Sequence, residues 1–421
     1  MLDIKFIREN IDLVKKNSAD RKALVDVDKL ISLDESWRKL QAEVQELRSQ
    51  RNKTSKTKPS PEEIANMKQV GEKISVLEEK QLDIENSLKE LMIAIPNLTH
   101  KDVKVSADED DNPVLATSGK INKFNFEAKD HVELAESLDL IDFDRATKVA
   151  GAKFYYLKNE LVLLNQALIQ YSLSIAMKHG FKPMLTPDLA KTSMVEGLGY
   201  NPRGESSQVY QIENNDLSLI GTAEITLGGY HADEILDLKE APIKYVGLSH
   251  CFRTEAGSYS KFSKGIFRVH QFEKLELFIY CKPNEAEKIH DEMLKIEKEI
   301  FSGLDIPFRV IDHCTADLGT PSFRTFDLEA WLPGKPNTEN GKGDWAEITS
   351  TSNCTDYQSR ALNIKFVDSD GEKKLVYTLN GTAIALPRAL IAIMENYQTK
   401  DGSIEIPKVL RPYLPFKKIS R

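Results

Sequence analysis

Polar and charged residues gather in four clusters whose neighbours favour β-strands, where an unpaired charge is costly. Arg253 and Arg268 flank one predicted hairpin, and a planar guanidinium suits bidentate binding of a phosphate or a carboxylate. Phe272 follows Arg268 by four residues, so the two-residue period of a strand predicts both on one face, where the ring can lie against a flat base. The four clusters are 221–224, 252–255 with 267–276, 347–353, and 378–388.

Glu347 opens the third cluster and is followed by hydroxyl residues, an oxygen-rich set that suits a magnesium ion bridging phosphates. Taken singly, these residues have simpler interpretations, because Arg253 and Glu255 can form an ion pair on an edge strand and Phe272 can belong to the core. Their coincidence in one stretch favours a nucleotide site. The sequence has no GxxxxGK(S/T) loop and no GxGxxG at a strand–helix junction. An ATP site here must therefore use arginines and acids.

Short β-like runs such as 243–248 and 275–280 must position these clusters. Helical periodicity covers 160–179, 283–300 and 386–397. Strands linked mostly by turns, with helices at the ends, predict an α+β fold around an antiparallel sheet.

A heptad pattern runs between residues 27 and 95 and predicts an antiparallel coiled-coil hairpin. Apolar residues alternate at spacings of three and four, and the prolines of segment 54–61 mark the turn between the two helices. A helix of about 28 residues spans roughly 40 Å. The basic residues near the turn are either a solvated helix end or an RNA contact that releases phosphate counterions. They are Arg48, Arg51, Lys53, Lys56 and Lys58.

The composition is that of a globular protein, with 41% hydrophobic and 29% charged residues. A net charge of −8 argues against indiscriminate coating of nucleic acid, including DNA, but permits a local basic surface. No apolar run reaches the roughly 20 residues of a membrane span, and residues 1–10 lack the hydrophobic region of a secretory signal. We therefore expect a cytoplasmic protein. The four cysteines form no CxxC pair and favour reduced, buried thiols over zinc ligands.

The segment 182–187, the hairpin with Arg253 and Arg268, and the helix entry at Pro387 and Arg388 resemble motifs 1, 2 and 3 of class II aminoacyl-tRNA synthetases. The strings 222–224, 252–257, 268–272, 347–353 and 379–382, together with residues 1–10 and the arm, resemble the bacterial type of seryl-tRNA synthetase. The resemblance covers essentially the whole chain. It implies a homodimer with an antiparallel catalytic sheet, with motif 1 near Pro187 at the dimer interface.

The resemblance also implies three parts of the chain. These are an N-terminal tRNA-binding domain at 1–100, a linker at 101–124 and a catalytic domain at 125–421. The arm would contact the long variable arm of tRNA(Ser), and tRNA(Sec) is a further possible substrate. This implication favours RNA binding over a solvated helix end for the basic residues near the turn of the hairpin. The tRNA-binding candidates are Arg48, Arg51, Lys53 and Lys56.

For the chemistry, the resemblance implies activation of L-serine with ATP and Mg²⁺. Arg253 would bridge the α-phosphate and the serine carboxylate, while Arg268 and Arg388 would hold the outer phosphates. Glu347 and Ser350 would bind magnesium. The implied ATP-binding set also includes Thr254, Glu255, Val269, Phe272, Ile348 and Thr349. The implied serine-binding set is Thr222, Ala223, Glu224, Arg253, Glu276, Asn380 and Thr382.

The sequence departs from the family pattern at three places. Lys264 stands where an arginine is common, the segment 336–345 is longer than in most relatives, and Thr382 replaces a serine while keeping the hydroxyl. His270 and Cys354 lie beside the motifs, but the reaction needs neither, so we expect structural roles. Two other functions stay open, namely a synthetase-like regulatory protein and a ligase that loads an amino acid onto a carrier protein. The intact Arg253, Glu347 and Arg388 weigh against the first, and the long arm weighs against the second.

Overall fold

The computed structural model describes residues 1–54, 60–200, 207–256, 262–337 and 341–421. The chain forms two compact units, Met1–Pro96 and Asn97–Arg421. No helix in the described part of the chain is long and apolar enough to cross a membrane.

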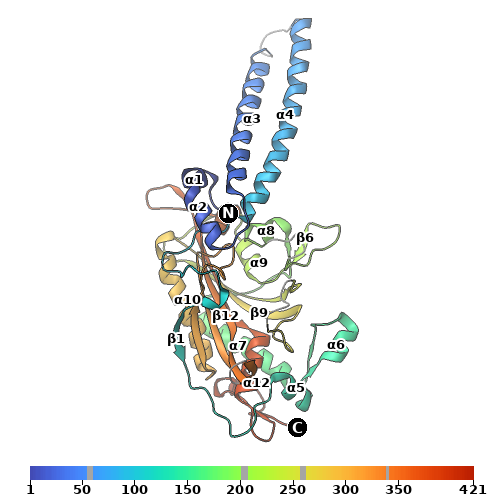
Figure 1. The fold of residues 1–421 in the computed structure, drawn as a ribbon, viewed down its shortest axis with the longest axis vertical. Helices are drawn as coiled ribbons and strands as arrows, with labels where there is room; N and C mark the ends of the chain where they lie inside the picture. The colour runs from blue at the N-terminus through green and yellow to red at the C-terminus, as the bar shows by residue number, and fades with distance from the viewer. Residues whose placement is uncertain (55–59, 201–206, 257–261, 338–340) are drawn as a thin grey trace. The chain divides into compact units, whose positions relative to one another are not determined.

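The first unit is built around two long helices that pack as a hairpin (Figure 1). Val44, Ile74 and Leu77 are buried between the helices, as the heptad pattern predicts. Ion pairs of 2.8 Å between Lys73 and Glu43 and of 2.6 Å between Arg48 and Glu78 flank this seam. The predicted coiled-coil arm is thereby confirmed. The helices are α1 (Ile4–Glu9), α2 (Ile11–Asp20), α3 (Val27–Thr54) and α4 (Pro61–Ala94).

The second unit contains, among its described residues, an eight-stranded sheet in the order β1-β10-β11-β12-β15-β9-β8-β4. Every neighbouring pair is antiparallel except β4 and β8. The α+β fold predicted from the sequence is confirmed. The strands are β1 (Val114–Ser118), β4 (Lys182–Leu185), β8 (Ile243–Phe252), β9 (Gln271–Cys281), β10 (Phe308–Asp312), β11 (Arg324–Asn337), β12 (Gly341–Thr355) and β15 (Tyr377–Ala385).

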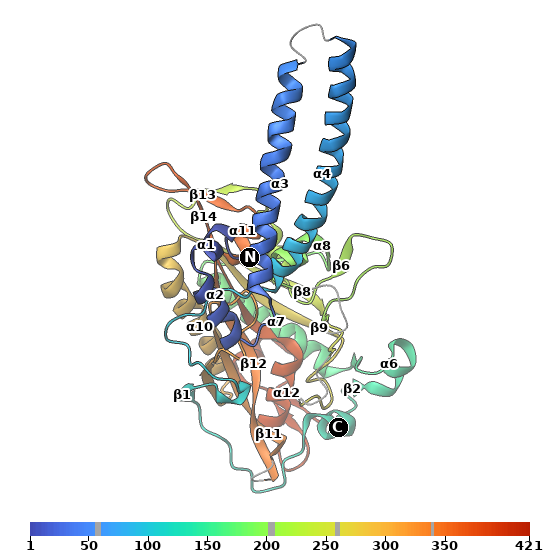
Figure 2. The same ribbon diagram turned by 45° about the horizontal axis from the view of Figure 1, so that its top comes forward.

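Helices cover one face of this sheet (Figure 2). Leu275, Leu277 and Ile279 of β9 point into the main core beneath these helices. Phe278 and Tyr280 alternate with them and belong to a second core. The covering helices are α5 (His131–Leu138), α7 (Glu160–Lys178), α10 (Ala286–Gly303) and α12 (Leu386–Asn396), and the second core packs with α8 (Thr192–Gly197), α9 (Glu224–Gly229) and α11 (Tyr357–Ala361).

Small elements complete the unit. They are the sheet pairs β2 (Ile141–Asp142) with β3 (Tyr156–Leu157), β5 (Leu189–Lys191) with β6 (Leu217–Leu219) and β16 (Ile404–Glu405) with β17 (Lys418–Ile419), the three-stranded sheet of β7 (Ile235–Leu236), β13 (Lys365–Val367) and β14 (Lys373–Leu375), and helix α6 (Phe143–Ala150).

Three sequence-based expectations differ from the structure. The stretch 101–124, expected as a linker, contains β1, which pairs with β10 in the main sheet. The cluster 221–224 is not in a strand, because Glu224 begins α9. Arg268 precedes the start of β9 at Gln271, so the strand period does not relate it to Phe272.

Candidate active site

A cavity of about 420 Å³ is lined partly by strands of the main sheet. Almost all of the site residues predicted from the sequence line it. Of the predicted ATP- and serine-binding residues, three are not part of the lining, namely Thr222, Ala223 and Thr254. The Thr254 hydroxyl instead donates to the carbonyl of Ser207 at 2.5 Å. The predicted residues that line the cavity are Glu224, Arg253, Glu255, Arg268, Val269, Phe272, Glu276, Glu347, Ile348, Thr349, Ser350, Asn380, Thr382 and Arg388.

Arg253 stands where β8 ends and is fixed on several sides. Its backbone N–H donates to the carbonyl of His270 at 3.0 Å, and the His270 Nδ1 lies 2.9 Å from the Arg253 carbonyl oxygen, which closes the base of the β8–β9 connection. Its Nε donates to the carbonyl of Gly221 at 3.2 Å, and its guanidinium lies 5.3 Å from the centre of the Phe272 ring. These contacts therefore fix the orientation of a guanidinium that lines the cavity.

The two other predicted arginines each pair with an acid that also lines the cavity. Arg268 Nη1 lies 3.3 Å from Glu255 Oε2, and Arg388 Nη1 lies 2.7 Å from Glu347 Oε1. Arg388 also lies over the Phe267 ring at 4.8 Å. Each of these two cations therefore has a carboxylate partner in the cavity wall.

A β-bulge in β12 explains how Glu347 and Ser350 line one cavity. In a regular strand, residues three apart point to opposite faces. The register with β11 pairs Leu328 with Thr349 and Glu329 with Glu347, so Ile348 is an extra residue. The extra residue brings Glu347 and Ser350 to the same side, and bulges commonly re-aim side chains in this way.

Two buried glutamates, Glu224 and Glu276, also line the cavity. Glu276 lies on β9 and forms an ion pair with Lys274, two residues earlier on the same strand face. Glu224 Oε2 accepts from the Tyr200 hydroxyl at 2.6 Å. Its Oε1 accepts from the side-chain amides of Gln358 at 2.6 Å and Asn380 at 2.9 Å.

The charges of the cavity shift the pKa values of its acids in opposite directions. Burial raises the pKa of Glu224, and the nearby charge of Glu276 adds to this. Burial also acts to raise the pKa of Glu347, but Arg388, His313 and Arg253 together outweigh it, so the net pKa is lowered. The acid beside the arginines is therefore kept ionised.

Sequence reasoning missed Lys274 and Tyr200, which both line the cavity. Lys274 had a usable signal, because Phe272, Lys274 and Glu276 alternate along one strand and must share a face. Tyr200 lies outside every motif and had none. His270 closes the hairpin, and Cys354 Sγ lies 3.4 Å from the Asn380 amide, so both are part of the packing around the site.

The oxygen atoms beside Arg388 fit magnesium only together with a nucleotide. Glu347 supplies one carboxylate and Ser350 one hydroxyl. No group of three or more His, Cys, Asp or Glu residues in the described part of the chain could hold a metal ion alone. Mg²⁺ in nucleotide sites typically uses one or two carboxylates, with phosphates and water completing the shell.

Two family models match the chain. A tRNA synthetase class II core domain (G, H, P, S and T) matches residues 208–397, and a seryl-tRNA synthetase N-terminal domain matches residues 1–99. A serine–tRNA ligase of Treponema denticola is 52% identical, with 100% of both chains covered. The chain belongs to the seryl-tRNA synthetase family. The family predicted from the sequence is confirmed.

Solved structures of the seryl-tRNA synthetase family have the same fold. The enzyme from Pyrococcus horikoshii, complexed with ATP, has a TM-score of 0.86 and 40% identity, with 100% of this chain and 99% of that chain covered. A cytoplasmic serine–tRNA ligase from Naegleria fowleri in complex with AMP has a TM-score of 0.83 and 32% identity, with the same coverage. Members of the family at both identities therefore carry adenine nucleotides.

Three of the four basic residues predicted to bind tRNA lie near the end of α3. Arg51 is exposed, and Lys53 lies in the last turn of the helix. Arg48 forms an ion pair of 2.6 Å with Glu78 of α4. Lys56 lies outside the described residues.

Proposed function

We propose that the chain is a serine–tRNA ligase that activates L-serine with ATP and transfers it to tRNA(Ser). In the first step a serine carboxylate oxygen bonds to the α-phosphorus of ATP, the bond to the β-phosphate oxygen breaks, and pyrophosphate leaves. In the second step the terminal ribose hydroxyl of the tRNA attacks the seryl carbonyl and AMP leaves. One observation carries the proposal: a single cavity is lined by Arg253, Arg268 and Arg388 together with the buried glutamates Glu224 and Glu276.

Arg253 would neutralise both reactants at the point where they meet. A guanidinium can hydrogen-bond the serine carboxylate and an α-phosphate oxygen at once. Its contacts with Gly221 and Phe272 fix its orientation before substrates bind, which is how preorganised charge lowers a barrier.

Arg268 and Arg388 would bind the outer phosphates and thereby leave Glu255 and Glu347 free for other contacts. Phe272 would stack on adenine, with Val269 beside it and Glu255 accepting from the adenine amino group. Glu347 and Ser350 would hold Mg²⁺, which when bound supplies charge neutralisation to the phosphates. Binding of ATP in this cavity is also consistent with the adenine nucleotides bound in the two solved structures described above.

The glutamates would recognise serine. Glu276 can accept from both the ammonium and the hydroxyl of serine, and Thr382 pairs directly with it across β15 and β9. Alanine would leave these buried acceptors unpaired, and a site built on hydrogen bonds rejects such an analogue strongly. Glu224 and Asn380 already bond each other, so they form a rigid floor for the ammonium.

We further propose a homodimer. Leu185 on the edge strand β4 is 82% exposed, and Val162, Leu163 and Met177 on the neighbouring α7 are also exposed. A patch of this kind on an edge strand is a typical protein interface. Light scattering after size-exclusion chromatography measures the mass, and Leu185→Asp should shift it from about twice 47.6 kDa to that of one chain.

A cytoplasmic location is part of the proposal. All four cysteines are free and buried, which suits a reducing compartment.

Serine-dependent ATP–pyrophosphate exchange, followed by charging of tRNA(Ser), tests the proposed reaction. Glu276→Ala should reduce exchange roughly 10²- to 10³-fold, because a buried partner of the substrate charge is removed, while its circular dichroism stays that of the wild type. Exchange without tRNA charging would favour a carrier-protein ligase, and absence of both would favour a regulatory protein. Near-normal exchange by Glu276→Ala would refute the residue assignment.

A further inference from the structure

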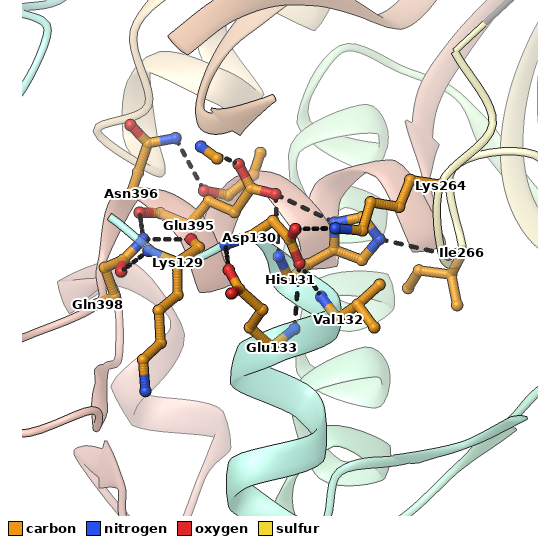
Figure 3. Close-up of polar contacts among 12 residues, drawn as sticks. Lys129, Asp130, His131, Val132, Glu133, Lys264, Ile266, Glu395, Asn396 and Gln398 are labelled. Carbon is orange, nitrogen blue, oxygen red and sulfur yellow. Dashed lines mark hydrogen bonds and ion pairs between the residues drawn. The ribbon is translucent and has the colours of Figure 1, made fainter. Parts of the chain in front are cut away.

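A buried polar cluster joins the end of α12 to the segment that leads into the cavity (Figure 3). Glu395 near the end of α12 and His131 at the start of α5 are almost fully buried, at 1% and 0% exposure. Glu395 Oε1 lies 3.0 Å from His131 Nδ1 and accepts from the His131 backbone N–H at 3.1 Å. Its other oxygen accepts from the Gly334 backbone N–H at 2.8 Å. The carboxylate thus binds three groups at once.

The contacts of His131 define its tautomer. Nδ1 faces a carboxylate oxygen, so it carries the proton and donates. Nε2 is then an acceptor, and the backbone N–H of Ile266 donates to it at 3.4 Å. Each ring nitrogen therefore has a different role, and the ring links Glu395 to the backbone of residue 266.

Two neighbouring residues hold the same segment. Lys264 pairs with Asp130, which also accepts from the backbone N–H groups of Val132 and Glu133 and caps α5. Gly265 has φ +58°, and a Cβ there would meet His131 Nε2 at 2.2 Å. Only glycine allows the backbone to pass this close to the ring.

The anchored segment continues directly into residues that line the cavity. Phe267 and Arg268 follow Ile266, and both belong to the wall. Arg388 at the start of α12 lies over the Phe267 ring at 4.8 Å. The same helix therefore contacts this segment twice, through Arg388 at its start and through Glu395 and His131 at its end.

We propose that His131 is a positioning residue for ATP: by accepting from the Ile266 N–H, with Glu395 fixing its tautomer, it holds Phe267 and Arg268 where the nucleotide binds. This inference rests on the proposed function, because it assigns the wall formed by Phe267 and Arg268 to ATP. His131 does not line the cavity. Its effect must therefore reach the nucleotide through the position of the segment 264–268.

Two substitutions separate the roles of the two ring nitrogens. His131→Asn places an amide nitrogen near the position of Nδ1 and keeps the donor to Glu395, but leaves the Ile266 N–H without its acceptor. His131→Gln can place its amide oxygen near the position of Nε2 and keep that acceptor, but removes the donor to Glu395. In exchange assays, we expect H131N to raise KM for ATP roughly 5- to 10-fold, the value of one lost hydrogen bond, with kcat and KM for serine within about twofold. We expect H131Q to keep KM for ATP within about twofold and to lower Tm.

The controls separate positioning from general loss of stability. Lys342→Ala removes an exposed ion pair of 3.0 Å with Glu127, just before α5, and should leave KM for ATP unchanged. If H131N is recovered unfolded, Gly265→Ala displaces the same segment and should raise KM for ATP by a similar factor. The inference would be overturned if the KM for ATP rose equally in H131N and H131Q, or rose in neither. In that case, serine-dependent exchange by the wild type would still support the proposed function. A wild type without exchange would overturn both.

Discussion

Arg388 and Glu347 form an ion pair in the wall of the cavity. Arg388 Nη1 lies 2.7 Å from Glu347 Oε1 and donates to the carbonyl oxygen of the same residue at 3.2 Å. The pair joins the start of α12 to the bulge in β12. A nucleotide with its magnesium can replace this contact by giving phosphate to the arginine and a cation to the glutamate. The pairing keeps both side chains aimed at the cavity before that exchange.

This relationship predicts the behaviour of Glu347→Gln. The amide keeps the size of the side chain but loses the charge that would hold Mg²⁺, so half-maximal exchange should need at least about 10-fold more magnesium, and kcat/KM for ATP should fall roughly 100-fold. Magnesium titrations of pyrophosphate exchange measure both. Asp344→Asn is a matched control on the same strand. Asp344 Oδ2 lies 2.8 Å from Lys335 Nζ and takes no part in the pair of Arg388 with Glu347. An unchanged magnesium requirement in E347Q would remove Glu347 from the proposed metal site.

The buried ion pair of Lys274 with Glu276 leads us to predict that loss of Lys274 lowers Tm and that serine restores part of the loss. Lys274 is 7% exposed and forms the ion pair with Glu276, which is 1% exposed. Lys274→Met leaves a buried carboxylate without its cation, which typically costs 3–5 kcal/mol and should be visible as a lower Tm. The serine ammonium brings a replacement cation, so saturating serine should raise the Tm of K274M by more than that of the wild type. Thermal unfolding with and without serine tests this, and alanine at the same concentration is the control. Equal serine-induced shifts would show that Lys274 and the substrate do not share Glu276.

The burial of His290 leads us to predict that its protonation lowers the stability of the fold in acid. Burial lowers the pKa of His290 from 6.5 to about 4, although its ring Nε2 lies 2.9 Å from the Thr351 carbonyl. Because the folded pKa is lowered, the unfolded chain binds more protons between these values, and stability is lost as the pH falls from 6.5 through about 4. At pH 5 the loss amounts to about 2 kcal/mol.

His290→Gln keeps a donor near the Thr351 carbonyl and cannot take up a proton. The variant should therefore lose less stability than the wild type between pH 7 and pH 5, as measured by urea unfolding of both proteins at each pH. Parallel losses in the two proteins would mean that His290 does not titrate in this range.

The sequence predicted those features that depend on local pattern and residue chemistry. The heptad spacing predicted α3 and α4, since an apolar seam has no other way to be buried. The arginines and Glu347 were found because charged residues are unusual among stretches rich in strand-forming residues, although only Glu347 lies within a strand. The cavity, however, depends on the bulge at Ile348, which arises from pairing with β11 and leaves no local signal. The roles of Tyr200 and His131 depend on contacts with Glu224 and Ile266, which are distant in the chain and fixed only by the tertiary fold.

The arm offers a test of tRNA binding that leaves the catalytic cavity untouched. Arg51 is exposed near the end of α3, whereas Arg48 is already paired with Glu78. Arg51→Glu should therefore raise KM for tRNA(Ser) roughly 5- to 10-fold and reduce the salt dependence of charging by about one counterion, because a phosphate contact is lost and a repulsion is added. Pyrophosphate exchange without tRNA should stay at the wild-type rate. Lys29→Glu makes the same charge change on an exposed residue of the same helix, roughly 33 Å away along its axis, and controls for net charge. Equal effects of the two substitutions on charging would mean that the tip makes no local contact with tRNA and that only the overall charge of the arm matters.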